Sequence, residues 1–238
     1  MNRTLLGILL VAVALLAVVL NVRFGSVTLS NSQAISALLG GGEEVHRTIL
    51  LDLRLPRAIL ALLVGGGLAL AGSVFQALLR NPLAEPYILG ISGGAATGAV
   101  LALSLGAASL GPAVLPAAAF GGALLAIVLV FRVAAAANRS MDVRVLLLAG
   151  VVVGAFFSAV IAFILTVSEA RAVRTAVIWM MGSLAGADWG SVWVAAGYTL
   201  PSVVLVLGLA RALNLLGIGE ETASYLGTDV ERVKKVAF

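Results

Sequence analysis

The stretch that decides the fold is residues 54–86, which read RLPRAILALLVGGGLALAGSVFQALLRNPLAEP. Its middle is a run of apolar and small residues, long enough to cross a lipid bilayer as a helix. Arg54 and Arg57 stand at one end, around a proline that is suited to a first helical turn. A polar turn braced by Pro82 and Pro86 stands at the other end. The pattern predicts a membrane span whose two ends have different functions, one with a pair of arginines and the other with a polar turn.

The composition of the whole chain also indicates a membrane protein. The 238 residues are 61% hydrophobic and 11% charged, and the mean hydropathy is +1.14. No soluble domain hides that much apolar surface, so the expected fold class is all-α, a polytopic transmembrane helical bundle. The net charge of +4 comes from basic residues spread between the apolar runs, a distribution that does not favour a nucleic-acid partner. With 0 cysteines, neither disulfides nor thiolate metal sites are expected.

Six apolar runs predict six transmembrane helices. The first run reads either as a cleaved signal peptide or as a span, and its length together with the bulky, charged residues that follow it favours a span. Arg and Lys are moderately more frequent on one side of this topology, which places the N-terminus in the cytoplasm. The predicted spans are Leu5–Val22, Ala58–Leu79, Ile88–Leu105, Ala113–Val133, Val145–Val167 and Val192–Leu209.

Arg54 and Arg57 are exceptions to this charge bias, because the topology places them on the outer side. Three positions apart at a helix mouth, their guanidinium groups are expected on neighbouring faces. They are suited to binding the carboxylates of a partner. Anchoring to lipid headgroups is the alternative interpretation.

The predicted spans carry almost no ionisable side chains, which argues against a proton relay inside the membrane. Metalloenzyme motifs are missing, and His46, the single histidine, is more typical of a solvated loop than of a metal site. Neither catalytic residues nor a cofactor nor a metal is therefore expected, and the energy source should be external. An ATP-independent membrane carrier and a membrane-embedded enzyme or scaffold are the disfavoured alternatives.

Residues 211–235 are too polar to span a bilayer and form a second informative region. Glu220–Leu226 predicts a short helix that ends at Gly227. Thr228 and Glu231 have the spacing of a capping box that begins another helix. Such a corner is suited to docking a soluble partner, or else it is an ordinary loop on the bilayer surface.

Together these motifs resemble the FecCD family of ABC-transporter permeases, which import iron siderophores, haem and vitamin B12. The resemblance covers nearly the whole chain from about Leu51, and the motifs are specific as a set. The matching segments are Arg54–Arg57, Gly65–Gly72, Gln76, Asn81–Pro86, Leu89–Gly90, Gly93–Ala95, Leu146–Gly150, Trp179–Leu184 with Trp189, Leu213–Asn214, Gly219–Glu220, Ala223 and Leu226–Gly227.

The resemblance implies a type II ABC importer permease fold and roles for matching residues. Arg54 and Arg57 would contact acidic residues of an extracytoplasmic substrate-binding protein. The positions implied at the cytoplasmic gate are Asn81, Leu83, Asp142 and Val143. The positions implied in the helices that sit in a groove of the ATPase are Gly219, Glu220, Ala223, Leu226 and Gly227.

The same resemblance implies the partners and the location. These are a cytoplasmic ATP-binding-cassette ATPase dimer, the binding protein, a second permease copy and membrane lipid, in a bacterial inner membrane. Residues 1–238 would form one permease domain, with residues 211–235 as its coupling-helix region and ATP hydrolysis in the partner. Ferric siderophore is the expected cargo by family frequency, with haem and cobalamin as alternatives.

Two features depart from the family pattern. The turn at residues 140–144 reads SMDVR where close relatives place small hydroxyl residues, so the sequence leaves the gate chemistry at Asp142 and Val143 open. Family members have about ten spans, whereas six are predicted here. The chain therefore resembles the N-terminal portion of a permease, truncated at its C-terminal end.

Overall fold

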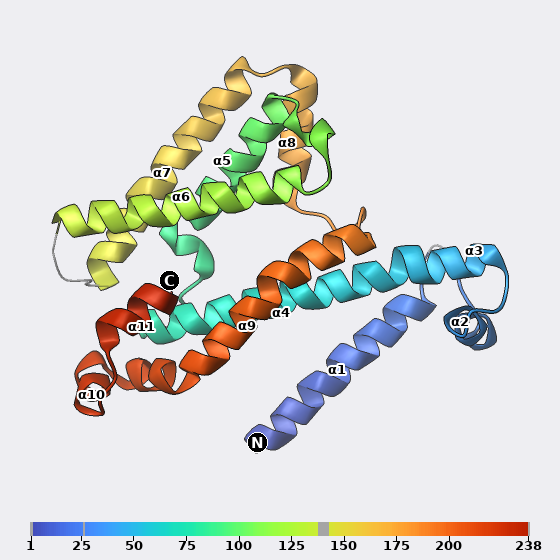
Figure 1. The fold of residues 1–238 in the computed structure, drawn as a ribbon, viewed down its shortest axis with the longest axis horizontal. Helices are drawn as coiled ribbons and strands as arrows, with labels where there is room; N and C mark the ends of the chain where they lie inside the picture. The colour runs from blue at the N-terminus through green and yellow to red at the C-terminus, as the bar shows by residue number, and fades with distance from the viewer. Residues whose placement is uncertain (1, 26, 138–142, 238) are drawn as a thin grey trace. The chain divides into compact units, whose positions relative to one another are not determined.

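The computed structural model describes residues 2–25, 27–137 and 143–237, and Figure 1 shows the course of the chain. Every regular element within these residues is helical, which confirms the all-α class. The elements are α1 (Arg3–Arg23), α2 (Asn31–Leu38), α3 (Glu44–Arg47), the π-helix η1 (Thr48–Arg54), α4 (Leu55–Leu79), the 3₁₀-helix η2 (Pro86–Leu89), α5 (Ile91–Ser104), the 3₁₀-helix η3 (Ala107–Leu110), α6 (Val114–Ala137), α7 (Val143–Val167), α8 (Ala170–Met181), α9 (Trp189–Ile218), α10 (Glu220–Tyr225) and α11 (Val230–Ala237).

Among the described residues, 5 helices are long and apolar enough to cross a membrane. They correspond to five of the six predicted spans, so the polytopic bundle is confirmed. Several extend beyond the predicted limits. In α9, for example, the polar residue Arg211, beyond the predicted limit at Leu209, remains helical. Long cationic side chains tolerate such positions by reaching toward the membrane surface.

The third predicted span, Ile88–Leu105, is wrong in its length. Gly90 adopts a left-handed conformation with φ 69° and separates η2 from α5, which therefore has only 14 residues. A helix of that length rises about 21 Å, less than the thickness of the hydrocarbon layer. A Cβ at position 90 would lie 2.8 Å from the Gly154 nitrogen, so the break requires glycine for space as well as for conformation.

The chain divides into two compact units, which are described separately. The first unit comprises Met1–Gly66 and Ser183–Thr199, and the second comprises Gly67–Gly182 and Leu200–Phe238. The boundaries fall inside α4 and α9, so each unit holds part of both helices.

The second unit is built on direct backbone contact between α5 and α6. A Cβ at Gly98 would lie 2.1 Å from the Ala118 carbonyl oxygen, and a Cβ at Gly94 would lie 2.4 Å from the carbonyl oxygen of Gly122. Side chains at these positions would therefore collide with main chain that cannot give way. Small residues allow membrane helices to approach this closely, which brings many atoms into van der Waals contact.

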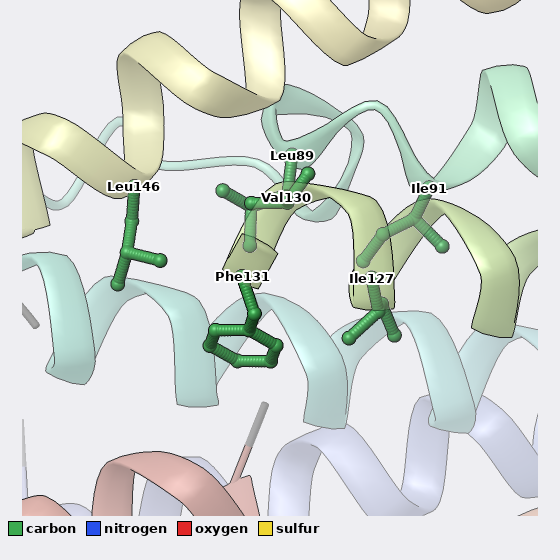
Figure 2. Close-up of a pocket in the computed structure, with 6 residues that line it drawn as sticks. All are labelled: Leu89, Ile91, Ile127, Val130, Phe131 and Leu146. Atoms are coloured by element: carbon green, nitrogen blue, oxygen red, sulfur yellow. The ribbon is translucent and has the colours of Figure 1, made fainter. Parts of the chain in front are cut away.

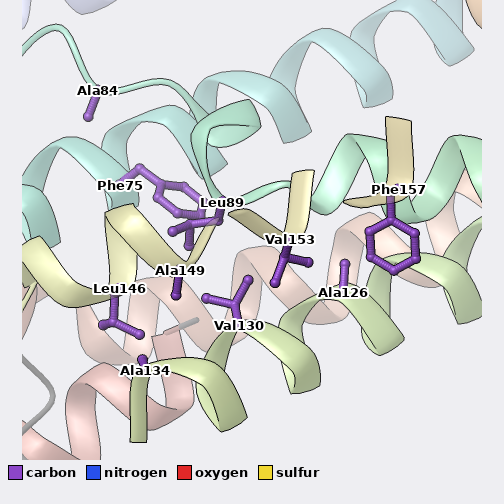
Figure 3. Packing of buried hydrophobic residues seen from close by; sticks show 10 residues of the cluster. All are labelled: Phe75, Ala84, Leu89, Ala126, Val130, Ala134, Leu146, Ala149, Val153 and Phe157. Atoms are coloured by element: carbon purple, nitrogen blue, oxygen red, sulfur yellow. The ribbon is translucent and has the colours of Figure 1, made fainter. Parts of the chain in front are cut away.

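An apolar cluster holds α7 against α6 and the η2 segment in the same unit (Figure 3). The buried α7 residues are three or four positions apart, so they form one face of the helix. They are Leu146, Ala149, Val153 and Phe157. Three buried α6 residues with the same spacing face them, namely Ala126, Val130 and Ala134.

Candidate functional site

The residues that the sequence predicts to be functional lie in two separate regions, one in each unit. In the first unit, Pro56 lies in the first turn of α4, and the π-helix η1 runs directly into that turn, so helical backbone also precedes the proline. The missing N–H of Pro56 leaves the Leu51 carbonyl, five residues earlier, without its partner in a π-helical register. Trp189 Nε1 donates to that oxygen at 3.0 Å. The indole N–H of Trp189 thus replaces the backbone donor that Pro56 lacks.

Arg54 lies at the end of η1 and is buried, with 6% of its surface exposed. Its Nη1 donates to the carbonyl oxygens of Val22 at 2.7 Å and Arg23 at 3.1 Å. Its Nη2 donates to the carbonyl oxygen of Val27. The guanidinium therefore neutralises the open carbonyl end of α1 and fixes the loop that follows.

Arg57 makes the same kind of contact with the other segment of the first unit. Its Nε donates to the Leu184 carbonyl at 3.1 Å, and its Nη2 donates to the Ala185 carbonyl at 3.0 Å. Arg54 and Arg57, with the five carbonyls they bind, are called the arginine clamp below. Both side chains bind main chain of this unit, and Arg57 is the more accessible of the two. Contact of either with a binding protein remains a prediction.

In the second unit, α4 ends in a turn that holds two of the predicted gate residues. Arg80 has a φ of 49°, a left-handed conformation that is uncommon outside glycine. The Asn81 N–H donates to the Gln76 carbonyl at 3.2 Å, which closes the helix end. The Asn81 side chain accepts from the Leu83 N–H at 2.9 Å, and Leu83 itself is 82% exposed. Asn81 is thus a structural residue of the turn, whereas Leu83 projects outward.

A cleft of about 1000 Å³ lies beside this turn, within the second unit. Val143 contributes to its wall, whereas Asp142, the other predicted gate residue, lies outside the described residues. Charged groups of both signs and apolar side chains line it together. The lining residues are Leu79, Arg80, Val143, Arg144, Leu147, Ile218, Gly219, Glu220, Glu221, Thr222, Glu231 and Lys234.

Glu220 joins three elements at the edge of this cleft. Lys234 Nζ on α11 donates to Glu220 Oε2 at 2.6 Å, and the Lys234 side chain is only 4% exposed. Arg80 Nη2, at the end of α4, lies 3.8 Å from Glu220 Oε1. These three residues are called the charged hub below. The sequence points to Glu220 but not to its partners Arg80 and Lys234, because their contact depends on how α4, α10 and α11 fold together.

The predicted corner of two short helices is confirmed. Gly227 has a φ of 80°, and the Thr228 N–H donates to the Ala223 carbonyl at 2.9 Å, which ends α10 in a Schellman motif. The predicted capping box at Thr228 is wrong by one residue. Asp229 caps α11 instead, because its Oδ1 accepts from the Arg232 N–H at 3.0 Å.

The predicted coupling residues face in different directions. Ala223 is fully buried in a second apolar cluster that joins α10 to α4, α9 and α11. Gly219 precedes α10 in extended backbone, and Glu220 turns toward the charged hub. Leu226 is 61% exposed, and its neighbour Tyr225 is 90% exposed. Tyr225 and Leu226 are therefore large apolar side chains on the outward surface of the corner.

A smaller cavity between η2, α6 and α7 is not a binding site (Figure 2). It holds about 10 Å³ and is lined by Leu89, Ile91, Ile127, Val130, Phe131 and Leu146. A buried water needs that much space and several polar partners, which this lining does not offer. Within the described ranges, no three His, Asp or Glu side chains gather in a way that could hold a metal ion.

Comparisons with known proteins agree on one type of molecule. A cobalamin import system permease protein BtuC of Halobacterium salinarum is 40% identical over 200 residues, which cover 82% of this chain and 52% of that protein. A vitamin B12 import system permease protein BtuC of Salmonella paratyphi A is 39% identical over 176 residues, covering 74% and 53%. The chain thus spans about half the length of these curated relatives.

A solved structure described as "an inward-facing conformation of a putative metal-chelate type ABC transporter" has a TM-score of 0.84 and 28% identity. The match covers 100% of this chain and 72% of the solved one. The model of the FecCD transport family matches residues 11–238. This chain belongs to the FecCD transport family.

Proposed function

We propose that this chain is part of the permease subunit of an ABC importer that moves a metal chelate across the bacterial inner membrane. The observation that carries the proposal is the likeness of the whole chain to a solved metal-chelate type transporter, with a TM-score of 0.84. The apolar helices supply the membrane-embedded path. The gate consists of Asn81 and Leu83, in the turn after α4, together with Asp142 and Val143, which are adjacent in sequence near the start of α7. The N-terminus lies in the cytoplasm.

Energy comes from a partner ATPase dimer that binds the corner formed by α10 and α11. Tyr225 and Leu226 support this assignment, because two exposed apolar side chains on a polar helix corner are suited to a groove in a soluble protein. ATP-driven closure of the dimer would move the corner and alternate access to the path. A second permease copy completes that path.

The substrate-binding protein docks at the arginine clamp. Arg57 uses its Nε and Nη2 for the Leu184 and Ala185 carbonyls, and its remaining N–H groups are suited to a carboxylate of the partner. Arg54 contributes by holding the loop after α1 in place. This docking is the electrostatic interaction that the sequence predicts, divided between one contacting and one supporting arginine.

The cargo is a large metal chelate, either cobalamin or a ferric siderophore. The relatives named for cobalamin import favour the first, and the solved transporter described as metal-chelate type is compatible with either. Haem is a third candidate. Specificity is expected to lie in the binding protein rather than in these helices, whose described surfaces are mostly apolar.

The test is uptake of radiolabelled cobalamin and of a labelled ferric siderophore by cells that lack the full-length gene. We expect one label to be lost and to be restored by the intact gene, but only when the partner ATPase is active. Restored uptake with an inactivated ATPase would overturn the proposal in favour of an ATP-independent carrier. Loss of neither label would exclude both cargoes.

A further inference from the structure

We infer that Glu220 is a positioning residue that transmits movement of the α10–α11 corner to the gate turn at the end of α4. The inference rests on the proposed function and deepens it. In the sequence, Glu220 reads as one of several residues that contact the ATPase. Its contacts in the structure are instead internal to the permease.

The carboxylate of Glu220 divides its two oxygens between two elements. Oε2 accepts from Lys234 of α11 at 2.6 Å, while Oε1 lies 3.8 Å from Arg80 at the end of α4. The side chain of Glu220 is 33% exposed, against 4% for Lys234. A charge buried as deeply as that of Lys234 requires a counter-charge, so the link between α10 and α11 is strong. The link to Arg80 is longer and more hydrated, so it can lengthen or tighten at small cost.

The residue that receives this link is well placed to act on the gate. Arg80 holds a left-handed backbone conformation, and the next residue, Asn81, closes the turn through its bonds to Gln76 and Leu83. A non-glycine residue in this conformation stores some backbone strain. A force on the Arg80 side chain therefore acts on the residue of the turn whose backbone conformation is strained.

Apolar packing joins α10 and α11 to the neighbouring ends of α4 and α9. Ala223 and Val233 are buried against Leu78 of α4 and Leu216 of α9. Such packing holds the helices together, but apolar burial is non-directional and does not determine which side chain a movement acts on. The charged hub is specific, since within it a movement of Glu220 acts on the side chain of Arg80. The cleft of about 1000 Å³, whose wall includes all three residues of the hub, leaves space for the displacement.

The experiment uses the full-length permease with its ATPase and binding protein, reconstituted in vesicles. The quantity measured is labelled cobalamin or ferric siderophore, whichever cells take up, transported per ATP hydrolysed. We expect Glu220→Gln and Arg80→Gln each to lower this ratio roughly threefold to thirtyfold, the range of measured coupling effects between linked sites. The double variant should fall no further than the stronger single one, because both remove the same link.

Glu169→Gln is the matched control, since Glu169 is an exposed glutamate directly before α8 whose side chain makes no cap hydrogen bond, and it lies outside the α10–α11 corner. It should leave the ratio unchanged. Co-purification of the ATPase should be equal for all variants. Loss of co-purification in Glu220→Gln would make Glu220 an ATPase contact and overturn the inference, as would an unchanged ratio or additive effects.

The inference and the proposed function fail in different ways. A wild-type complex that takes up neither cargo contradicts the proposed function. A wild-type complex that transports, beside an unchanged ratio in both single variants, contradicts only the role of Glu220. If Glu220→Gln folds poorly, Arg80→Gln still decides, because the Arg80 side chain is 48% exposed and contributes little to packing.

Discussion

The helix α4 has an arginine at each end, and the two are held in opposite ways. Arg54, directly before its first residue, is buried and binds neutral carbonyl oxygens. Arg80, directly after its last residue, is half exposed and lies near a carboxylate. Hydrogen bonds to fixed main chain hold a rigid arrangement, whereas a hydrated ion pair can adjust its length. The difference separates a clamp that fixes structure from a link that permits movement.

The largest expected effect is at the rigid end. Arg54→Ala should lower the free energy of unfolding by about 3 kcal/mol, because it removes charge-assisted bonds and leaves part-buried carbonyls without donors. Thermal unfolding of the detergent-solubilised permease measures this change. Arg171→Ala, which removes an exposed arginine of α8, is the control and should have little effect. If Arg54→Ala changed the free energy of unfolding as little as Arg171→Ala, the hydrogen bonds of Arg54 would not stabilise the fold.

At Arg80, at the other end of α4, we expect a change of the opposite sign in the free energy of unfolding. Arg80→Gly should raise the free energy of unfolding by about 0.5 kcal/mol, since relief of the left-handed backbone outweighs loss of an exposed ion pair. The same variant should transport less cargo per ATP. If Arg80→Gly lowered stability as much as Arg54→Ala, Arg80 would also be a residue that fixes structure, and the contrast between the two ends of α4 would be wrong.

A third polar contact of the first unit gives a smaller effect with a different signature. Asp188 precedes α9, and its Oδ1 accepts from the Ser191 hydroxyl at 2.6 Å and the Ser191 N–H at 2.7 Å. These bonds lower the pKa of Asp188 below its usual value. Its contribution is therefore complete above about pH 4 and is lost as the pH falls further, through the folded-state value.

The check is the acid dependence of unfolding. Asp188→Ala should lower stability at neutral pH, as expected for loss of a helix cap. The difference from wild type should shrink as the pH falls below about 4, because the folded-state carboxyl becomes protonated at the lower end of that range. The effect of Arg54→Ala should not change over that range, because the bonds that it removes involve no carboxyl group. A constant difference for Asp188→Ala would contradict the assigned bonds.

The smallest effect is the response to salt. Raising the ionic strength from 0.1 M to 1 M shortens the screening length from about 10 Å to about 3 Å. The stability difference between wild type and Arg80→Gln should then shrink by a few tenths of a kcal/mol, in the range of exposed ion pairs. The difference for Arg54→Ala should stay constant. A salt response at Arg54 would show that its contacts are more hydrated than the geometry indicates.

The sequence predicts the helices of this molecule better than their contacts. Apolar runs and the Gly227 stop are local signals, and both are confirmed. The break at Gly90 was missed because it arises from close approach to Gly154, which is distant in the chain. Glycines look alike in sequence, yet Gly98 meets the Ala118 backbone while Gly65 has nothing within 4 Å.

The candidate site shows the same limit. Its residues were identified from motifs, but motifs do not say toward what a side chain turns. Arg54 turns inward to carbonyls that lie 27 to 32 positions away, and Glu220 turns to Lys234 and Arg80. Such partners follow from packing, which one sequence does not specify by pattern.

The bond between Trp189 and the Leu51 carbonyl has an evolutionary consequence. The oxygen is available because Pro56 lacks an N–H, so neither the proline nor the indole can be explained without the other. A relative that replaces Pro56 with another residue regains an internal donor for Leu51 and no longer needs a tryptophan at position 189. Selection should therefore act on the two positions as a pair, and an alignment of homologues should show them exchanged together.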